Sequence, residues 1–404
     1  MIPINRPDFG VKDIFAFISG HFKDNITPTF EEMFTQYIGM GYGIFTSSCR
    51  SALYLTYKSL KLEGEVVVSP LTCSIAILPI ICSGLKPHFV DVDPQTYNID
   101  PEKINESITK NTRAIQVIHL AGNPCDVKQI MEIADDHNLI VVEDCAQSLG
   151  AEYHKRKVGS FGNVSCFSFT KSMYGIGGGM ITTDDKNLVL KINKLQKELP
   201  NFPAPLKYYR LFRDNIERVR GSHFGDILYN MFSYLKSNTI LDEHEDCNFL
   251  KNTRFLYNPT NVEAVISLSQ FEVLDKMIEK RLQNASLLTK SLKKIPDVKI
   301  QKTTNKSKHV FMKYMIETKY NCIDIIKKLH EKKIEAKHLT HSHETSYQDR
   351  LDRNPLYARF NSIKNCENYL RIHDNIVSLP ISSNMKKGES IYIAERLREI
   401  IENG

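Results

Sequence analysis

The stretch Val164-Ser-Cys-Phe-Ser-Phe-Thr-Lys171 ends an apolar run with a lysine, and the glycine cluster Gly175-Ile-Gly-Gly-Gly179 follows shortly after it. The apolar residues up to Phe169 have the pattern of a buried strand, so Lys171 is expected at the end of that strand. The neutral amine of a lysine in a glycine-lined pocket can condense with a carbonyl such as that of an aldehyde cofactor. Alone, such a short motif would more often mark a surface lysine.

A second apolar run, Leu139-Ile-Val-Val142, is followed directly by the acids Glu143 and Asp144. Ligands of open α/β sheets bind at the carboxyl ends of the strands, so Asp144 is placed to meet a bound group. A carboxylate in this position suits a cationic ring nitrogen, although an aspartate could instead cap the next helix. Lys171 and Asp144 together favour a pyridine cofactor.

With these residues in view, the chain resembles the pyridoxal-phosphate (PLP) aminotransferases of the DegT/DnrJ/EryC1/StrS group, which are mostly sugar aminotransferases with the aspartate-aminotransferase fold. The resemblance runs over roughly residues 40 to 190 and is weaker in the second half. The matching segments are Phe45–Leu53, Pro87–Asp93, Tyr97–Asp100, Ile118–Gly122, Glu143–Gln147, Val158–Gly162, Cys166–Phe169, Gly177–Asp185, Gln270–Asp275 and Val377–Ile381. Each segment is a weak signal alone, but their order and spacing make a strong set.

The resemblance implies a role for each matching residue. Lys171 corresponds to the lysine that forms the Schiff base with the cofactor and moves the proton between substrate carbon and cofactor. Asp144 corresponds to the acid that keeps the pyridine nitrogen protonated, and Gln147 to the residue near the phenolic oxygen. Ser168 and Ser51 correspond to phosphate-side positions, in agreement with the preference of helix N-termini for phosphate.

Some residues of the expected cofactor pocket depart from the family pattern. Where a Gly-Thr pair is usual, this chain has Cys49 and Arg50. Arg50 could bind the phosphate or an acidic substrate, or it could be a surface residue in the first turn of a helix. In the segment around Thr72, another cofactor-binding candidate, Cys73 stands where the family often has an aromatic ring.

Other site assignments have less support from the sequence. The chain is two residues shorter than expected before the lysine, so the phosphate serine could instead be Ser165 or Ser172. Asn258 is the candidate for a segment that many relatives contribute from the neighbouring subunit. His338 and His341 are candidates for contact with the acceptor substrate, because relatives often have a substrate loop there. Together with His343 and Glu344, their spacing fits no zinc pattern, so no metal is expected.

Relatives that carry histidine in place of the lysine are dehydratases, so the retained Lys171 favours a transaminase. The resemblance implies an amino donor, most often glutamate, and a keto-sugar acceptor, expected to be nucleotide-linked, for a polysaccharide or a glycosylated metabolite. Two alternatives stay open at this point. One is a PLP-dependent dehydratase or a transaminase for a non-sugar ketone, and the other is a non-catalytic PLP-binding regulatory protein.

Composition agrees with a globular enzyme. The chain has 404 residues, 42% of them hydrophobic, and a formal net charge of +6, which gives little support for nucleic acid as a partner. The nine cysteines form no C-x-x-C pair, and with no secretory signal they favour reduced thiols in the cytoplasm. Active sites in this fold are usually shared across a dimer, so we expect a homodimer.

The order of predicted elements indicates an α/β protein of PLP-dependent transferase fold type I. A large domain, residues 1–258, is expected to hold a mostly parallel central sheet flanked by helices, and residues 259–404 a smaller α+β domain. Strands are predicted near Val66, Phe89, Ile115, Ile140, Ser165, Ile181, Phe311 and Val377, and helices over Ala52–Leu62, Ile75–Cys82, Pro101–Ile108, Asp126–His137, Asn261–Lys293 and Glu389–Glu402.

The segment 203–241 combines aromatic residues with arginines and is predicted to be a helical insert or lid. Its basic and aromatic side chains could meet a nucleotide diphosphate, an anionic membrane surface or the partner subunit. It could equally be an ordinary helical pair that packs on its own domain.

Overall fold

The computed structural model describes residues 1–6, 8, 11–20, 25–173, 175–201, 256–339 and 351–403. The predicted insert at 203–241, and His341, His343 and Glu344, lie outside the described residues. Within the described part, no helix combines the length and the apolar character needed to cross a membrane.

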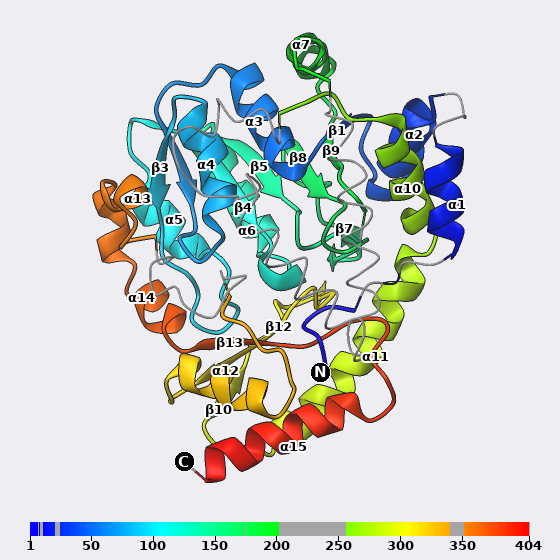
Figure 1. The fold of residues 1–404 in the computed structure, drawn as a ribbon. Helices are drawn as coiled ribbons and strands as arrows, with labels where there is room; N and C mark the ends of the chain where they lie inside the picture. Colours follow the sequence, from blue (N-terminus) through cyan, green and yellow to red (C-terminus); the bar gives the residue numbers. More distant parts are fainter. Residues whose placement is uncertain are drawn as a thin grey trace.

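A seven-stranded sheet, in the order β1-β9-β8-β5-β4-β2-β3, forms the centre of the larger part of the molecule (Figure 1). Its strands are β1 (Tyr42–Thr46), β2 (Glu65–Val68), β3 (Lys86–Phe89), β4 (Thr112–Ile118), β5 (Ile140–Asp144), β8 (Val164–Ser168) and β9 (Gly179–Thr183). Strands β3, β2, β4, β5 and β8 are parallel to one another, whereas β9 is antiparallel to both β8 and β1. The predicted, mostly parallel central sheet is confirmed.

Helices cover the sheet because the inner strands are buried on both faces and need apolar cover. They are α2 (Thr27–Ile38), α3 (Cys49–Leu60), α4 (Ser74–Cys82), α5 (Pro101–Ser107), α6 (Val127–Asp136) and α7 (Lys186–Lys197), with a 3₁₀ turn η1 (Leu120–Gly122). Side-chain caps begin several of them: Asp126 accepts from the amide of Gln129, and Asp185 accepts from Leu188. The predicted helices of this region agree with α3 to α6 within a few residues.

The predicted single helix Asn261–Lys293 is wrong, because two helices occupy this range. A capping box between Thr260 and Glu263 starts α10 (Asn261–Phe271), and α11 (Leu274–Leu292) follows after a break at Val273, whose ψ of 2° is not helical. Helix α10 packs on α1 (Val11–Ser19) and α2, whereas α11 packs on α15 (Glu389–Glu402) near the C-terminus.

The smaller part of the molecule is built on an antiparallel sheet in the order β10-β12-β13, with α12 and α15 packed against it (Figure 1). The elements are β10 (Val298–Ile300), β12 (Tyr314–Thr318), β13 (Ile376–Leu379) and α12 (Cys322–Glu331). The strand predicted near Phe311 begins instead at Tyr314, because Phe311 has a φ of +46°, in the left-handed region. The terminal helix is found where it was predicted.

Two features join the two parts. Helix α11 contributes Ile278 to the core beneath the large sheet and Leu288 to the core of the smaller part, so the chain passes between the cores along this helix. A small sheet in the order β11-β6-β7 also pairs β11 (Ser307–Lys308) with β6 (Glu152–Tyr153), next to β7 (Arg156–Lys157). We keep 1–258 and 259–404 as a proposed division of the sequence.

The remaining elements are α13 (Pro355–Ala358), η4 (Asn361–Asn365) and α14 (Glu367–His373). In sequence they lie between β12 and β13 of the smaller sheet, yet their apolar residues Tyr357, Ile363 and Tyr369 pack into the core of the larger part. Backbone amides of Asn368 and Tyr369 donate to the carboxylate of Asp91, at 2.8 and 2.9 Å, which fixes α14 to the segment that follows β3.

Candidate active site

The carboxylate of Asp144 lies at the carboxyl end of β5, near the middle of the large sheet. It is 4% exposed, and its Oδ1 accepts hydrogen bonds from the amide of Ala146 at 3.0 Å and from the thiol of Cys49 at 3.7 Å. Burial raises the pKa of Asp144, against the opposing effects of the Ala146 amide and the positive charge of Lys171. A cation bound here would therefore compensate the negative charge of a carboxylate that is buried and only weakly stabilised by its neighbours.

The neighbouring acid, Glu143, has a structural role. Its side chain is fully buried; Oε2 lies 3.1 Å from Nε2 of His119, and the two oxygens accept from the amides of Gly159, Phe161 and Gly162 at 2.8, 2.9 and 2.6 Å. Burial alone would raise the pKa of Glu143, but these bonds outweigh it and hold the pKa below its ordinary value. Glu143 is thus occupied in fastening the 159–162 loop to the sheet.

His119, Glu143 and Cys145 form the one group of potential metal ligands found among the described residues, with ligand atoms within 4.8 Å of one another. The Nδ1 of His119 already accepts from the amide of Cys125 at 3.0 Å, and its Nε2 lies against Glu143. Since both ring nitrogens and the carboxylate are engaged, we interpret the group as a hydrogen-bonded core cluster.

Lys171 lies in the turn after β8, partly buried, on the side of the sheet edge where Asp144 lies. Its charge favours the ionised form of Asp144 and also acts on the buried Cys49 thiol, so the three side chains share one site. The structure therefore brings together the two residues on which the sequence interpretation depended most.

The glycine cluster after Lys171 lets β9 approach the start of α3. A Cβ on Gly179 would lie 2.6 Å from the carbonyl carbon of Ser48 and 2.7 Å from the amide nitrogen of Cys49, closer than real contacts allow. Gly178 has a φ of +89° and donates its amide to Ser47 at 2.9 Å. The N-terminus of α3 is thereby held close to the strand that follows Lys171.

Hydroxyl groups gather near this helix start. Ser48 caps α3 by accepting from the amide of Ser51, whose own Oγ is buried and has no hydrogen-bond partner among the described residues. The Oγ of Ser172 is likewise buried and has no hydrogen-bond partner among the described residues, whereas the Oγ of Ser168 lies 3.1 Å from Oγ1 of Thr170. Helix amides and buried hydroxyls without partners are the groups that a phosphate requires.

Gln147 and Thr72 are buried near the same strand ends. Oε1 of Gln147 accepts from the amide of Ala121 at 2.9 Å, which leaves its amide nitrogen as a donor for an oxygen in the site. Thr72 is 2% exposed and precedes Cys73, the residue before α4. Arg50 lies partly buried in the first turn of α3.

Two further predicted residues contact other parts of the chain. Asn258 donates its side-chain amide to the carbonyl of Leu199 at 2.7 Å, beyond the end of α7, so its role toward a neighbouring subunit stays a prediction. His338 lines a cavity in the smaller part, with its Nε2 bonded to the carbonyl oxygen of His373.

The sequence interpretation missed two cationic residues that the fold brings close to Lys171. Arg281 of α11 is 2% exposed, with its guanidinium 3.5 Å from the carbonyl of Ser172 and 3.4 Å from that of Val310. Lys313 precedes β12, and burial, followed by the charge of Lys171, lowers its pKa. In the sequence, both residues have the pattern of surface residues, because one is an arginine in an amphipathic helix and the other a lysine before an apolar strand. The sequence therefore carries only a weak signal for their place near the site.

Comparison with known proteins decides the family. The sequence matches the DegT/DnrJ/EryC1/StrS aminotransferase family over residues 20–200 and 226–398. The chain belongs to this family. It is 31% identical to the GDP-perosamine synthase of Escherichia coli O157:H7, over 72% of this chain and 68% of the relative.

Two other similarities bear on this family member. It is 41% identical to the dTDP-3-amino-3,6-dideoxy-alpha-D-galactopyranose transaminase of Aneurinibacillus thermoaerophilus, over 46% of this chain and 51% of the relative. Its fold is similar to that of the Helicobacter pylori aminotransferase involved in the biosynthesis of pseudoaminic acid, with a TM-score of 0.78 at 20% identity and complete coverage of both chains. The predicted family and fold type I are confirmed.

This family member is a PLP-dependent aminotransferase, and the residues present fit that cofactor. The amine of Lys171, the buried carboxylate of Asp144 and the amide of Gln147 supply a nucleophile, a counter-charge for a ring nitrogen and a donor for a ring oxygen. The unbonded hydroxyls of Ser51 and Ser172 at the start of α3 and after Lys171 suit its phosphate.

Proposed function

We propose that the protein transfers an amino group from glutamate to the ketone carbon of a nucleotide-linked keto sugar, in the biosynthesis of a polysaccharide or a glycosylated metabolite. The observation that carries this proposal is the shared site of Lys171 and Asp144 at the carboxyl ends of β5 and β8. The names of the relatives, which act on GDP- and dTDP-linked sugars, support the class of acceptor.

In this proposal each residue has a defined task. When bound, PLP supplies the electron sink that stabilises negative charge on the substrate carbon. Lys171 holds and moves the proton at that carbon, and Asp144 keeps a positive charge on the ring nitrogen through a buried ion pair. Gln147 orients the ring by donating to its oxygen, while Ser51, one of the two serines Ser168 and Ser172, and the first amides of α3 bind the phosphate.

Thr72 and Arg50 are proposed as further cofactor contacts, and Asn258, His338 and His341 as contacts to substrate or to a neighbouring subunit. Thr72 is buried in the loop before α4, and Arg50 lies in the first turn of the helix assigned to the phosphate. We also propose a homodimer with shared active sites in the cytoplasm. Sedimentation of an active monomer would contradict the dimer.

Lys171 also weighs against the two alternatives. The dehydratases that the family resemblance suggests have histidine in this position, and a regulator without turnover would have no need of a lysine that moves a proton at the substrate carbon. Turnover assays with keto-sugar nucleotides and with non-sugar ketones decide between the two classes of acceptor.

The test compares wild type with Lys171→Ala and with Lys191→Ala, which removes an exposed lysine of α7. With PLP, wild type and Lys191→Ala are expected to show the visible absorption band of a lysine-bound cofactor and to release 2-oxoglutarate from glutamate. Lys171→Ala should lose both, with a rate loss of about 100-fold or more. Keto-sugar nucleotides are then tested as acceptors, and turnover of only non-sugar ketones would overturn the proposed acceptor.

A further inference from the structure

A small cavity opens beside the proposed active site, between the N-terminal segment and the sheet of the smaller part. It has a volume of about 220 Å³, and its polar lining residues are Asn5, Lys313, Lys337, His338 and Ser378. The other lining residues are apolar, and no acidic side chain is among the described residues that line it. The volume is below the range of pockets for drug-sized ligands, so the cavity suits one group of a substrate.

Lys313 connects this cavity with the proposed active site. Its backbone amide donates to the carbonyl of Ala121 at 3.3 Å, and the amide of Ala121 in turn donates to Gln147. The packing there is tight, because a Cβ on Gly122 would lie 3.1 Å from the amide nitrogen of Met312. Lys313 is therefore held against the loop that positions Gln147.

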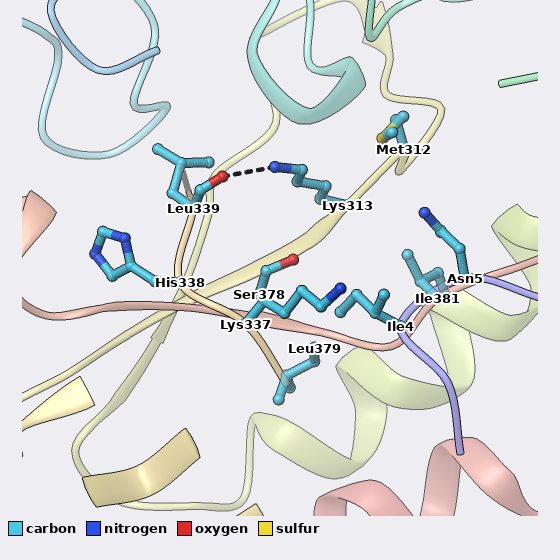
Figure 2. Close-up of a pocket in the computed structure, with 10 residues that line it drawn as sticks. All are labelled: Ile4, Asn5, Met312, Lys313, Lys337, His338, Leu339, Ser378, Leu379 and Ile381. Carbon is cyan, nitrogen blue, oxygen red and sulfur yellow. Dashed lines mark hydrogen bonds between the residues drawn. The ribbon is translucent and has the colours of Figure 1, made fainter. Parts of the chain in front are cut away.

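The ammonium group of Lys313 has unused hydrogen-bonding capacity. Its Nζ donates to the carbonyl oxygen of Leu339 at 2.6 Å (Figure 2), while a lysine ammonium has three donors. No carboxylate among the described residues forms an ion pair with Lys313. Burial, and then the positive charge of Lys171, lower its pKa to about 8; Cys73 opposes this shift and Lys337 adds to it.

Ser378 supplies a second polar group without a partner. Its side chain is 2% exposed, its Oγ has no hydrogen-bond partner among the described residues, and Figure 2 shows the hydroxyl pointing to the space around which Lys313 and Asn5 lie. The backbone holds this group in place, because Ser378 and Lys337 exchange hydrogen bonds of 2.7 and 3.0 Å. A buried hydroxyl without a partner costs free energy that a bound acceptor would recover.

The neighbouring charges indicate how much negative charge the cavity can accept. Lys337 is partly neutralised by Glu335, whose Oε1 lies 3.1 Å from its Nζ. His338 has its ring turned away from Lys313 and bonded to the carbonyl oxygen of His373. The uncompensated charge is therefore about that of one lysine, which matches a monoanion and not a dianionic phosphate.

We propose that Lys313 and Ser378 bind a substrate carboxylate beside Lys171. The inference rests on the proposed function, since it assigns a substrate group to the site of that reaction. A carboxylate accepts from both an ammonium and a hydroxyl, and its binding would compensate the charge of Lys313. Such a carboxylate belongs either to the acidic amino donor or to an acceptor that is a sugar acid.

The test measures binding to the PLP-loaded protein by titration calorimetry, with glutarate as probe for the donor carboxylate and glucuronate as probe for a sugar carboxylate. Glucose is the neutral control. Wild type is compared with Lys313→Met, which removes the charge, with Lys313→Arg, which keeps it, and with Ser378→Ala. The absorption of the bound cofactor verifies that each variant is folded.

At pH 7 the Kd of one probe is expected to rise about tenfold or more in Lys313→Met, less in Ser378→Ala, and little in Lys313→Arg. The probe that responds identifies the source of the carboxylate. Between pH 7 and pH 9 wild type should lose about tenfold in affinity as Lys313 loses its proton, whereas Lys313→Arg should not. Because Lys171, Lys337 and Cys73 are the same in both proteins, the comparison isolates the charge at position 313.

Equal carboxylate affinity of wild type and Lys313→Met, or no binding of either probe to wild type, would overturn the inference. The outcome is separable from that of the proposed function, which fails if glutamate yields no 2-oxoglutarate in the same preparation. Loss of turnover with an intact Lys313-dependent Kd would overturn the transamination proposal and leave the carboxylate site in place.

Discussion

The thiol of Cys49 lies 3.7 Å from Oδ1 of Asp144, and both side chains are buried at the carboxyl end of the large sheet. Burial, and then the negative charge of Asp144, raise the pKa of the Cys49 thiol well above its usual range, so the group stays protonated. A protonated thiol can only donate to the carboxylate, and this bond favours the ionised form of Asp144. The cysteine that departs from the family pattern thus contacts the residue proposed to hold the cofactor's ring nitrogen.

Replacing Cys49 by alanine should shift the acidic limb of the pH–rate profile to higher pH. Without the thiol the pKa of Asp144 rises. As the pH is lowered, the rate of a reaction that needs the ionised carboxylate therefore begins to fall at a higher pH than in wild type. We expect the glutamate half-reaction of Cys49→Ala to be about threefold to tenfold slower than wild type near pH 6 and nearly unchanged near pH 9. Stopped-flow absorption of the cofactor measures this rate.

Cys49→Ser is the matched control, because a hydroxyl also donates to the carboxylate. Its pH profile should follow that of wild type. A Cys49→Ala profile that overlays the wild-type profile would show that the thiol has no influence on Asp144 during the reaction.

Asp144→Asn should abolish activity with little loss of stability. Asparagine has the same shape as aspartate and still accepts the hydrogen bond from the amide of Ala146. Burial raises the pKa of Asp144, so the fold tolerates a neutral group in this position. The rate of the glutamate half-reaction should fall about 100-fold to 1,000-fold, because the ring nitrogen loses its counter-charge. Rapid-quench assays of 2-oxoglutarate, together with thermal melting, separate the two effects, and near-normal turnover would contradict the role of Asp144.

Glu143→Gln, one residue earlier, should destabilise the fold, in contrast to Asp144→Asn. The carboxylate of Glu143 accepts from His119 and from three backbone amides, and a glutamine places an NH₂ group among these donors. Breaking such a buried network costs about 3–5 kcal/mol of folding free energy. A variant that melts like wild type would show that the network contributes little.

The stability difference between wild type and Glu143→Gln should depend on pH in one direction. The folded state lowers the pKa of Glu143 below the ordinary value of 4.5, so its contribution is complete above that value and is lost as the pH falls through the folded-state pKa. The two proteins should therefore differ fully at pH 7 and converge in acid. Urea unfolding at pH 7, 5 and 4 measures the difference, and a constant gap would exclude ionised Glu143 as its source.

Strand ends were predictable because they depend on local sequence. The apolar runs before Asp144 and Lys171 are short, continuous and bounded by polar residues or glycines, so strands β5 and β8 and the position of both side chains followed from pattern alone. The antiparallel direction of β9 did not follow, because strand direction is set by the chain's return path and by packing against Ser48 and Cys49.

Other parts of the fold depend on long-range contacts. No proline or glycine at Val273 indicates the helix break in the sequence. The break separates α10, which packs on α1, from α11, which packs on α15. Lys313 likewise reaches the site through a hydrogen bond to Ala121, far away in sequence. Patterns within a window of one helix or strand carry no information on such pairings.

Gly179→Ala should weaken cofactor binding more than it weakens the fold. The new Cβ would meet the backbone of Ser48 and Cys49 at 2.6 and 2.7 Å, and also the carbonyl oxygen of Phe167 at 2.6 Å, so the start of α3 must move away from β9. If this helix start binds the phosphate, the Kd for PLP should rise at least about tenfold. Gly84→Ala is the control for the steric effect, because no atom lies within 4 Å of its added Cβ; unlike Gly179, Gly84 has a positive φ of +91°. Gly84→Ala should lose about 1 kcal/mol of stability from backbone strain and keep its affinity for PLP. Equal PLP affinities of the two variants, measured by equilibrium dialysis, would place the phosphate away from the N-terminus of α3.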